Sequence, residues 1–312
     1  FRLDTVKHVE HEFWQRHRRE TQARVSPDFF LLAEVWGGSA TVLDDYFVND
    51  EMDAGFDFTF KGSCESFVQG KGRTIAFASY LEKRHKVRPG YHLAHYLSSH
   101  DEPMSLHNLG GDLDAFRLCV ALQMTSLGIP TIYYGEEVAR DGSVWPLNRN
   151  DMPWGARAVQ PGKGVKRDED LRAYYRKLIE TRRNNTALSR GDYRTLSSDG
   201  DLLVFERHDA GRSAVFIEHD RDVHALLEHL VEQVADGLGF WDEDRRTQLG
   251  AQIEGLAAPA APRSRQPAQQ VLDVKHADDA VDRILKDRDA AVPAFADHRR
   301  NPAQVVGQFQ HF

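Results

Sequence analysis

Three carboxylates that can do acid–base or nucleophilic chemistry each stand at the end of a short apolar run. In FRLDTVKH, Arg2 and Asp4 point to the same face of a strand because side chains alternate, and the arginine keeps the carboxylate charged and oriented, as a nucleophile requires. In FFLLAEVWGG, Glu34 ends an apolar run, and a carboxyl against apolar and aromatic surface suits a general acid. In HYLSSHDEP, the adjacent His100 and Asp101 can hydrogen-bond two neighbouring hydroxyls. Each pattern alone is weak evidence of a site, because strand-end salt bridges and solvent-facing carboxylates are common.

The elements that position these residues alternate between strand and helix from residue 1 to about 185. The expected strands span residues 1–3, 29–33, 55–60, 91–97 and 129–134, and the expected helices span residues 11–23, 71–85, 115–126 and 168–184. This alternation is typical of βαβ units on a parallel sheet. Active sites of parallel α/β folds form at the carboxyl ends of the strands, where the three carboxylates fall.

A second region begins near Asn185. Residues 193–196, 202–206 and 213–217 read as short strands separated by the turn sequences SDG and DAG. We therefore expect a small antiparallel β region over residues 186–217.

The composition changes after residue 217. Residues 218–312 contain five of the chain's 31 aromatic residues and no tyrosine, and the segment AAPAAPRSRQPAQQ reads as a linker. We expect this tail to be helical or disordered. Two explanations stay open: an unrelated extension of the protein, or a reading-frame slip in the source gene near codon 218, which the abrupt loss of aromatic residues favours.

The composition of the whole chain excludes several classes of protein. With 40 Lys and Arg against 48 Asp and Glu, the net charge is −8, which argues against a nucleic-acid binder or a polybasic membrane-surface protein. No run approaches the ~18 apolar residues of a membrane-spanning helix. Two cysteines, Cys64 and Cys119, cannot build a disulfide framework or a four-thiolate zinc site, so we expect both to be buried as small apolar side chains.

The three carboxylates with their neighbours, in this order and at these spacings, resemble the alpha-amylase family of glycoside hydrolases (family 13). The resemblance covers residues 1–217 and includes FRLDTVKH, the EVW segment at 34–36, GIPTIYYGEE at 128–137 and NRNDMPW at 148–154. It implies that residues 1–185 form part of a glycoside hydrolase catalytic domain. The implied fold is the C-terminal half of a (β/α)8 TIM barrel, strands 4–8, followed by the start of a C-terminal β-sandwich at 186–217 and an irregular or helical tail at 218–312.

The resemblance also assigns roles to the residues that match the family's motifs. Asp4 resembles the nucleophile, Glu34 the acid/base and Asp101 the third carboxylate, which holds sugar hydroxyls. The family's contacts to the substrate or its leaving group match four further residues: Arg2, Lys7, His8 and His100. The implied reaction is retaining hydrolysis of α-glucosidic bonds in starch or maltooligosaccharides, with a covalent glycosyl-enzyme intermediate and no cofactor.

Several departures from the family pattern bear on what this chain can do. Ser99 replaces the usual Asn before His100–Asp101, and the family's first barrel strands have no counterpart here. We therefore expect a piece of a longer protein that is inactive alone. The absent half would also supply the side chains of a structural Ca²⁺ site in the full-length parent, to which His8 would add only its backbone carbonyl. We expect no metal site within this chain.

Two alternatives stay open from the sequence. An α-glucosidase or a glucan transferase or isomerase of the same family shares the three carboxylates, and a non-catalytic carbohydrate-binding or partner-chain relative typically loses one of them. We expect an α-glucan or maltooligosaccharide as the partner, with no nucleic acid and no membrane. No targeting segment is visible in this sequence, and because we expect a piece of a longer protein, the compartment stays open between cytoplasmic and secreted. The sequence does not determine the oligomeric state.

Overall fold

The computed structural model describes residues 1–84, 87–156, 166–200, 202–209, 212–219 and 233–234. Its first sheet has five strands, all parallel, in the order β1-β2-β3-β4-β5. The strands are Arg2–Leu3 (β1), Leu32–Ala33 (β2), Ala54–Asp57 (β3), His92–Tyr96 (β4) and Ile129–Thr131 (β5). Strand order follows chain order, as expected for consecutive βα units. This α/β fold with a parallel sheet is consistent with a partial TIM barrel.

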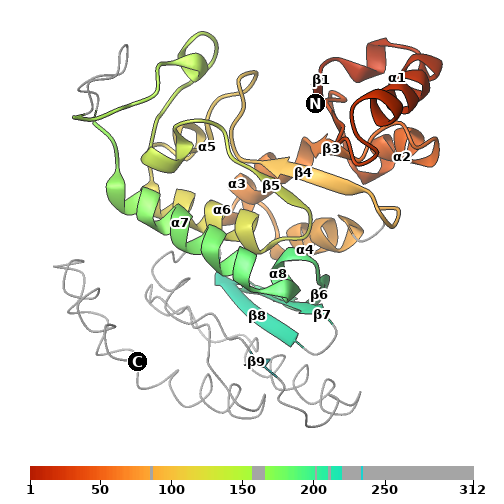
Figure 1. The fold of residues 1–312 in the computed structure, drawn as a ribbon. Coiled ribbons are helices and arrows are strands. Elements are labelled where there is room, and N and C mark those ends of the chain that lie inside the picture. Colours follow the sequence, from red (N-terminus) through yellow and green to blue (C-terminus); the bar gives the residue numbers. More distant parts are fainter. Residues whose placement is uncertain (85–86, 157–165, 201, 210–211, 220–232, 235–312) are drawn as a thin grey trace, which may run out of the picture.

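Helices connect the strands and lie against one side of the sheet (Figure 1). In chain order they are His11–Arg24 (α1), Ala40–Val48 (α2), Thr59–Val68 (α3), Thr74–Lys83 (α4), Ser105–Asn108 (α5), Leu113–Thr125 (α6), Glu169–Asn184 (α7) and Thr186–Ser189 (α8). The start of α7 follows from its sequence, because the Asp168 side chain accepts a hydrogen bond from the backbone N–H of Leu171. Acidic residues in its first turn and arginines in its last turn complement the helix dipole.

The strand predicted over residues 55–60 extends too far at its C-terminal end. Strand β3 stops at Asp57, and Thr59 already begins α3. The apolar Phe60 that suggested a continuing strand is fully buried, but as a residue of the helix. An apolar run of this length fits either element. Helix α2 was also not expected; it begins after Gly37 and Gly38, with Ser39 capping it by accepting from the Val42 N–H.

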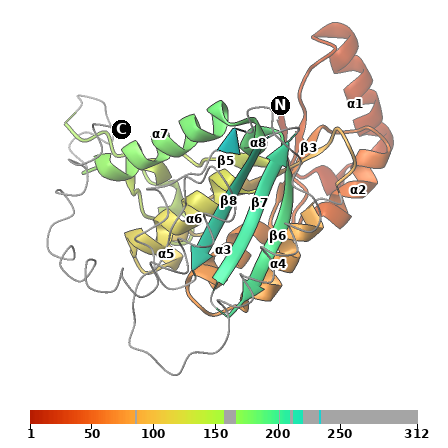
Figure 2. The same cartoon turned by 90° about the horizontal axis from the view of Figure 1, so that it is seen from below.

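A second, antiparallel sheet follows α8. Its order is β6-β7-β8-β9, with strands Asp192–Asp199 (β6), Leu202–Asp209 (β7), Arg212–His219 (β8) and Gln233–Val234 (β9). The three strands expected over residues 193–217 are confirmed, and each is longer than predicted. Figure 2, which views the molecule from below, shows this sheet on the side that faces the viewer, and β6 and β7 contact α4.

The expected boundaries of the domains at residues 185 and 217 stay predictions. The expected tail, residues 218–312, lies outside the described residues except for 218–219 in β8 and 233–234 in β9.

The buried apolar side chains form two clusters. The larger one lies between α3, α4, α6, α7 and the second sheet, and includes Phe60, Phe116 and Phe205. Both cysteines, Cys64 and Cys119, are buried in this cluster and are not joined by a disulfide, and the sequence had predicted that both are buried. The smaller cluster packs α1 and α2 against β1 and β2. The larger cluster therefore joins the helices of the first sheet to the second sheet.

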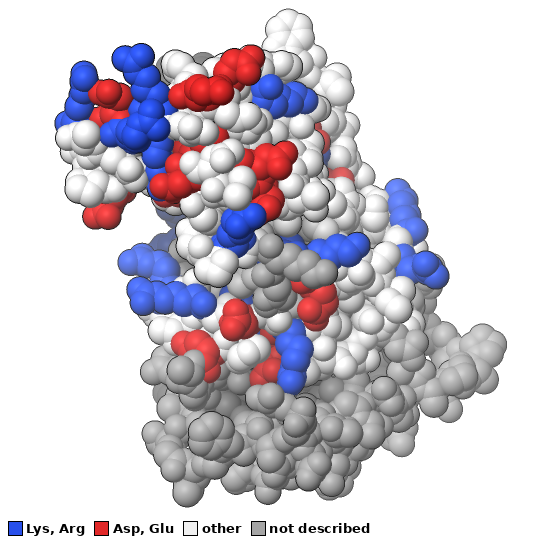
Figure 3. All heavy atoms as spheres, turned by 90° about the vertical axis from the view of Figure 1, so that its right-hand side faces the viewer, with Lys and Arg blue, Asp and Glu red and all other residues white. Residues whose placement is uncertain are grey.

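Helix α1 is fixed to the sheet by charge pairs as well as by apolar packing. Its Arg18 donates two hydrogen bonds to Asp53 at 2.6 and 2.8 Å and one to Asp50 at 3.2 Å. The hydrogen bonds that Arg18 donates to Asp53 raise the pKa of Arg18, and they outweigh burial, which lowers it. Figure 3 shows basic and acidic side chains mixed over the N-terminal part of the molecule. Ion pairs in this part of the chain include Arg24 with Glu20 at 2.7 Å and Arg88 with Asp44 at 2.6 Å.

Candidate active site

Asp4 and Glu34 are brought together where β1 and β2 end. The parallel pairing sets Leu3 beside Ala33, so the two following carboxylates leave the sheet at the same edge. The Arg2 guanidinium lies 2.7 Å from Asp4 Oδ1 and 3.9 Å from Glu34 Oε2. Because one planar guanidinium spans both contacts, the Asp4 and Glu34 oxygens are at most about 9 Å apart.

The two carboxylates have different surroundings. The Glu34 side chain is 9% exposed and the Asp4 side chain is 64% exposed. The backbone N–H of Thr5 donates to Glu34 Oε2 at 2.7 Å, and Thr5 adopts a left-handed conformation with φ of 50°. Glu34 is therefore shielded and fixed through Oε2, while Asp4 faces solvent.

Lys7 and His8 lie in the 3-10 turn Val6–His8 that follows β1. The Lys7 ammonium donates to the backbone carbonyl of Trp36 at 3.4 Å, which links this turn to the loop after β2. His8 is exposed at the end of the same turn. Both residues thus lie at the edge of the sheet that carries Asp4 and Glu34.

Asp101 and His100 form a second group, after β4. His100 Nε2 lies 3.0 Å from Asp101 Oδ2, and Arg149 Nη2 donates to Asp101 Oδ1 at 3.1 Å. The backbone N–H of Asp101 donates to Ser99 Oγ at 3.2 Å, so the serine that departs from the family pattern supports the turn. Among the described residues, no hydrogen bond or ion pair joins Asp101 to Asp4 or Glu34.

A row of aromatic rings connects the two groups across the end of β3. The ring centroids of Trp36 and Phe58 are 5.0 Å apart, and those of Phe58 and Tyr96 are 5.7 Å apart. The Tyr96 hydroxyl donates to Glu102, the neighbour of Asp101, at 2.5 Å. Trp36 is 50% exposed. The row therefore runs from the exposed Trp36 indole, which can stack on an apolar face of a ligand, to the buried Tyr96 beside the Asp101 turn.

A fourth carboxylate at this edge, Asp57, has a structural role. It ends β3 but is 1% exposed. It accepts from the Tyr80 hydroxyl at 2.5 Å and lies 3.4 Å from Arg84 Nε, both on the helical side of the sheet. Arg84 also contacts the fully buried His95, whose pKa is lowered well below its ordinary value by burial and by the Arg84 charge. Asp57 therefore fixes the sheet to α4.

Sequence reasoning assigned no role to two residues of the 148–154 segment that contact the Asp101 turn. The Asn148 amide donates to the backbone carbonyls of His100 and Glu102 at 2.8 and 3.2 Å, and Arg149 binds Asp101. The motif itself was visible in the sequence as NRNDMPW. What it contacts was not, because about 48 residues separate the two segments.

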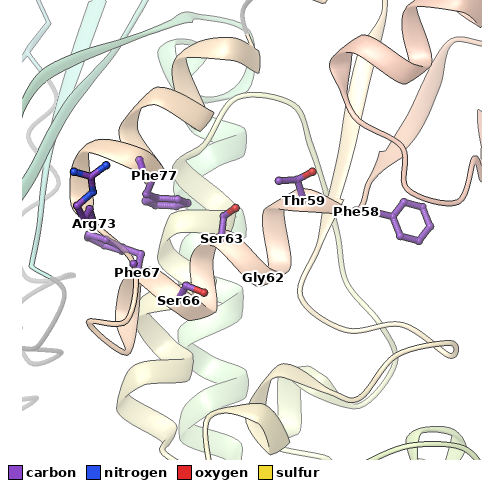
Figure 4. A pocket seen from close by; sticks show the side chains of 10 residues that line it. Phe58, Thr59, Gly62, Ser63, Ser66, Phe67, Arg73 and Phe77 are labelled. Carbon is purple, nitrogen blue, oxygen red and sulfur yellow. The ribbon is translucent and has the colours of Figure 1, made fainter.

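A surface hollow of about 470 Å³ lies between α3 and α4. In Figure 4 the Ser63 and Ser66 side chains lie along α3 at this hollow, whereas the Phe58 ring points away. Phe58 is the one lining residue that also belongs to the aromatic row of the carboxylate edge. The hollow is separate from the candidate active site.

The described residues contain neither a metal-binding cluster nor a membrane-spanning helix. Within the part of the chain that the structure describes, no three His, Cys, Asp or Glu side chains are placed to hold a metal ion. Over the same residues, no helix has the length and apolar character that crossing a bilayer requires.

Comparison with known proteins gives a consistent match. The family model for the alpha-amylase catalytic domain matches residues 1–173. A cyclomaltodextrinase of Bacillus sp. is 29% identical over 233 residues, which cover 72% of this chain and 39% of that protein. Neopullulanase 2 of Thermoactinomyces vulgaris is 30% identical over 213 residues, which cover 66% of this chain and 34% of that protein.

Solved structures agree with these sequence matches. A cyclic alpha-maltosyl-(1→6)-maltose hydrolase from Arthrobacter globiformis has a TM-score of 0.62 at 26% identity and covers 70% of this chain and 47% of its own. An alpha-amylase from Geobacillus thermoleovorans, complexed with acarbose, also has a TM-score of 0.62 at 26% identity, with coverages of 71% and 48%. The chain therefore spans under two fifths of these curated relatives and about half of these solved chains.

Proposed function

Because the chain belongs to the alpha-amylase family of glycoside hydrolases, we propose that it carries the catalytic carboxylates of a retaining hydrolase of α-glucosidic bonds. The proposed substrates are starch-type glucans and maltooligosaccharides, in keeping with the cyclomaltodextrinase and maltogenic amylase names of its relatives. The observation that carries the proposal is the Arg2 guanidinium between Asp4 and Glu34. This guanidinium contacts both the exposed Asp4 carboxyl and the shielded Glu34 carboxyl.

The five parallel strands correspond, in this proposal, to strands 4–8 of a (β/α)8 barrel, with residues 1–185 as the partial catalytic domain and 186–217 as the start of the C-terminal β-sandwich. Support comes from the sheet order, which follows chain order, and from the match to about half of each solved barrel enzyme. In the relatives, the remaining barrel strands would lie in the part of their sequence that this chain does not match.

The proposed mechanism is a double displacement. Glu34 gives a proton to the glycosidic oxygen while an Asp4 oxygen attacks the anomeric carbon, so that the glycosidic bond breaks and a glycosyl–Asp4 ester forms. Glu34, now a carboxylate, then takes a proton from water, which attacks the ester and releases Asp4. Glu34 Oε2 is occupied by the Thr5 N–H, so we assign the transferred proton to Oε1.

The distance requirement of this mechanism is compatible with the structure. Retaining glycosidases hold their two carboxyls roughly 5–5.5 Å apart, which lies within the upper limit of about 9 Å set by the rigid Arg2 fork. Asp101 and His100, on the far side of the aromatic row, would hold two sugar hydroxyls. Lys7 and His8 would line the leaving-group side, and no cofactor takes part.

Steady-state turnover by this chain alone should be absent. Only part of the relatives' length is present, and a misplacement of 1 Å can cost about 100-fold in rate. An assay on soluble starch and on a chromogenic maltooligosaccharide should show no turnover that depends on Glu34. Robust turnover that Glu34→Gln abolishes would show that residues 1–312 are sufficient.

The carboxylate roles can be tested without steady-state turnover. An α-glucosyl fluoride with a second fluorine at C5 forms the covalent glycosyl–enzyme intermediate, and the second fluorine slows the hydrolysis of this intermediate. The labelled protein therefore accumulates even when the first step is slow. Peptide mass spectrometry should find the glycosyl ester on Asp4. Asp4→Asn should abolish labelling. Glu34→Gln should still label, because fluoride leaves without protonation, and its ester should persist longer. Labelling elsewhere, or none in the wild-type chain, would refute the proposed function.

A further inference from the structure

The turn that carries Asp101 is held from outside its own strand. Arg149 Nε donates to the His100 carbonyl at 2.9 Å, and Arg149 Nη2 donates to Asp101 Oδ1 at 3.1 Å. The neighbouring Asn148 amide, which is buried, donates to the carbonyls on both sides of Asp101. One guanidinium thus binds the backbone and the side chain of the same turn.

Arg149 is itself anchored to the loop after β5. Arg140 is buried and donates to the Asn148 and Asn150 carbonyls, each at 3.2 Å. Its guanidinium lies 4.0 Å from the centroid of the Tyr134 ring, and the Tyr134 hydroxyl donates to the Asn150 carbonyl at 2.8 Å. The backbone on both sides of Arg149 is therefore fixed, which restricts where its side chain can reach.

The contacts of Asp101 determine which of its acceptor sites are open to a ligand. Arg149 binds Oδ1 and His100 lies at Oδ2. Each carboxylate oxygen can accept about two hydrogen bonds, so one acceptor site remains on each oxygen. Two fixed oxygens with one open site each suit two neighbouring hydroxyls of a sugar ring. Rotation of the carboxylate would lose this match.

We propose that Arg149 is a positioning residue, which sets the rotation of Asp101 so that both carboxylate oxygens face vicinal hydroxyls of a glucosyl ring. This inference rests on the proposed function. Arg149 acts through Asp101 and does not touch the sugar. Hydrogen bonds to the sugar hydroxyls strengthen in the transition state of glycoside cleavage, so misorientation of Asp101 slows the chemical step more than it weakens binding of the ground state.

The test measures how fast the fluorinated α-glucosyl fluoride labels Asp4 at increasing reagent concentration. For Arg149→Gln we expect the rate at saturation to fall about 10- to 100-fold, with the half-saturating concentration changed less than about threefold. Arg149→Lys should be intermediate, because a point charge can bind Asp101 but not also fork to the His100 carbonyl. A purely structural role would not produce this division between rate and binding.

Arg88→Gln is the matched control. Arg88 is also bound to an aspartate, Asp44, at 2.6 and 3.1 Å, and its side chain is 45% exposed against 46% for Arg149. It should label at the wild-type rate. Urea unfolding midpoints should be similar for all three variants.

Each outcome decides the inference. If the wild-type chain labels and Arg149→Gln labels equally fast, the inference is wrong and the proposed function stands. The inference is also wrong if Arg149→Lys and Arg149→Gln lose the same factor in rate. It is likewise wrong if only the half-saturating concentration changes, because neither pattern reflects the orientation of Asp101. A wild-type chain that does not label refutes the proposed function, and this inference with it.

Discussion

Glu136 should make the folding stability of this protein fall as pH rises through neutrality. It lies in the 3-10 turn Glu136–Val138 after β5 and is 1% exposed. Neither carboxyl oxygen meets a hydrogen-bond donor in good geometry among the described residues. Burial, aided by the charge of Glu137, raises the pKa of Glu136 from 4.5 to about 8, although the nearby Ser98 hydroxyl opposes the shift. Glu136 is therefore neutral in the folded protein at pH 7.

The sign and size of the effect follow from linkage. Between pH 4.5 and about 8 the unfolded chain has lost the Glu136 proton while the folded protein still holds it. Stability from this group is therefore complete below pH 4.5 and declines by about 1.4 kcal/mol per pH unit across that window. The total approaches about 5 kcal/mol, which is comparable to the whole stability of a marginal domain.

Glu136→Gln removes the titration and keeps the shape of the side chain. Urea unfolding of both proteins, followed by tryptophan fluorescence at pH 5, 6, 7, 8 and 9, gives the difference in unfolding free energy. That difference should move in favour of the variant by about 1.4 kcal/mol per pH unit and level off above pH 8. Any fixed cost of burying the amide is independent of pH and cancels from the slope.

Glu180→Gln, at an exposed carboxyl on α7, serves as the control and should show a flat difference. Contributions from all other titrating groups are common to the wild type and the variant and drop out. If the difference for Glu136→Gln is also flat between pH 5 and 8, Glu136 is ionised in the folded protein. The argument from burial would then be wrong.

Three further substitutions, one of them with a matched control, test contacts within the described core, each by urea unfolding. Arg207→Met should destabilise by about 3 kcal/mol, because it leaves two buried backbone carbonyls and a partly buried one without this donor; an unchanged midpoint would contradict this. Gly128→Ala should cost about 2–5 kcal/mol, since φ is +104° and a Cβ would lie 2.5 Å from a backbone carbonyl, whereas Gly200→Ala, also at positive φ but in open space, should cost less. Tyr96→Phe should cost about 1–2 kcal/mol by removing the hydroxyl that donates to Glu102; a stabilised variant would show that this bond is not formed.

Much of the architecture was predictable because it depends on local patterns. The five strands follow from short apolar runs separated by helical stretches, and their parallel order follows from the alternation of the two. The start of α7 was readable from Asp168, because a cap depends on residues a few positions apart. The contact of Arg2 with Asp4 was predictable for the same reason, since alternation along a strand puts positions two apart on one face. A short apolar run fits the periodicity of a helix as well as that of a strand. At the end of β3 this made the predicted end of the strand wrong.

Contacts between distant segments were not predictable in this way. Asp57 and Asp101 both follow apolar strands, and nothing in their neighbours separates a buried structural carboxylate from an accessible one. That difference depends on the side of the sheet to which each side chain points. Asp57 points to the helical side, where Arg84, at the C-terminal end of α4, covers it.

The sequence by itself thus determined which strands form and which carboxylates end them, because hydrophobic periodicity and capping act over a few residues. Beyond the contact of Arg2 with Asp4, only the tertiary structure decided what each carboxylate touches. Arg2 lies between Asp4 and Glu34, Thr5 donates to Glu34, and Arg149 reaches Asp101 across 48 positions of the chain. These contacts depend on strand register and on how loops from different strands meet at one edge of the sheet. Neither is encoded in the spacing of neighbouring residues.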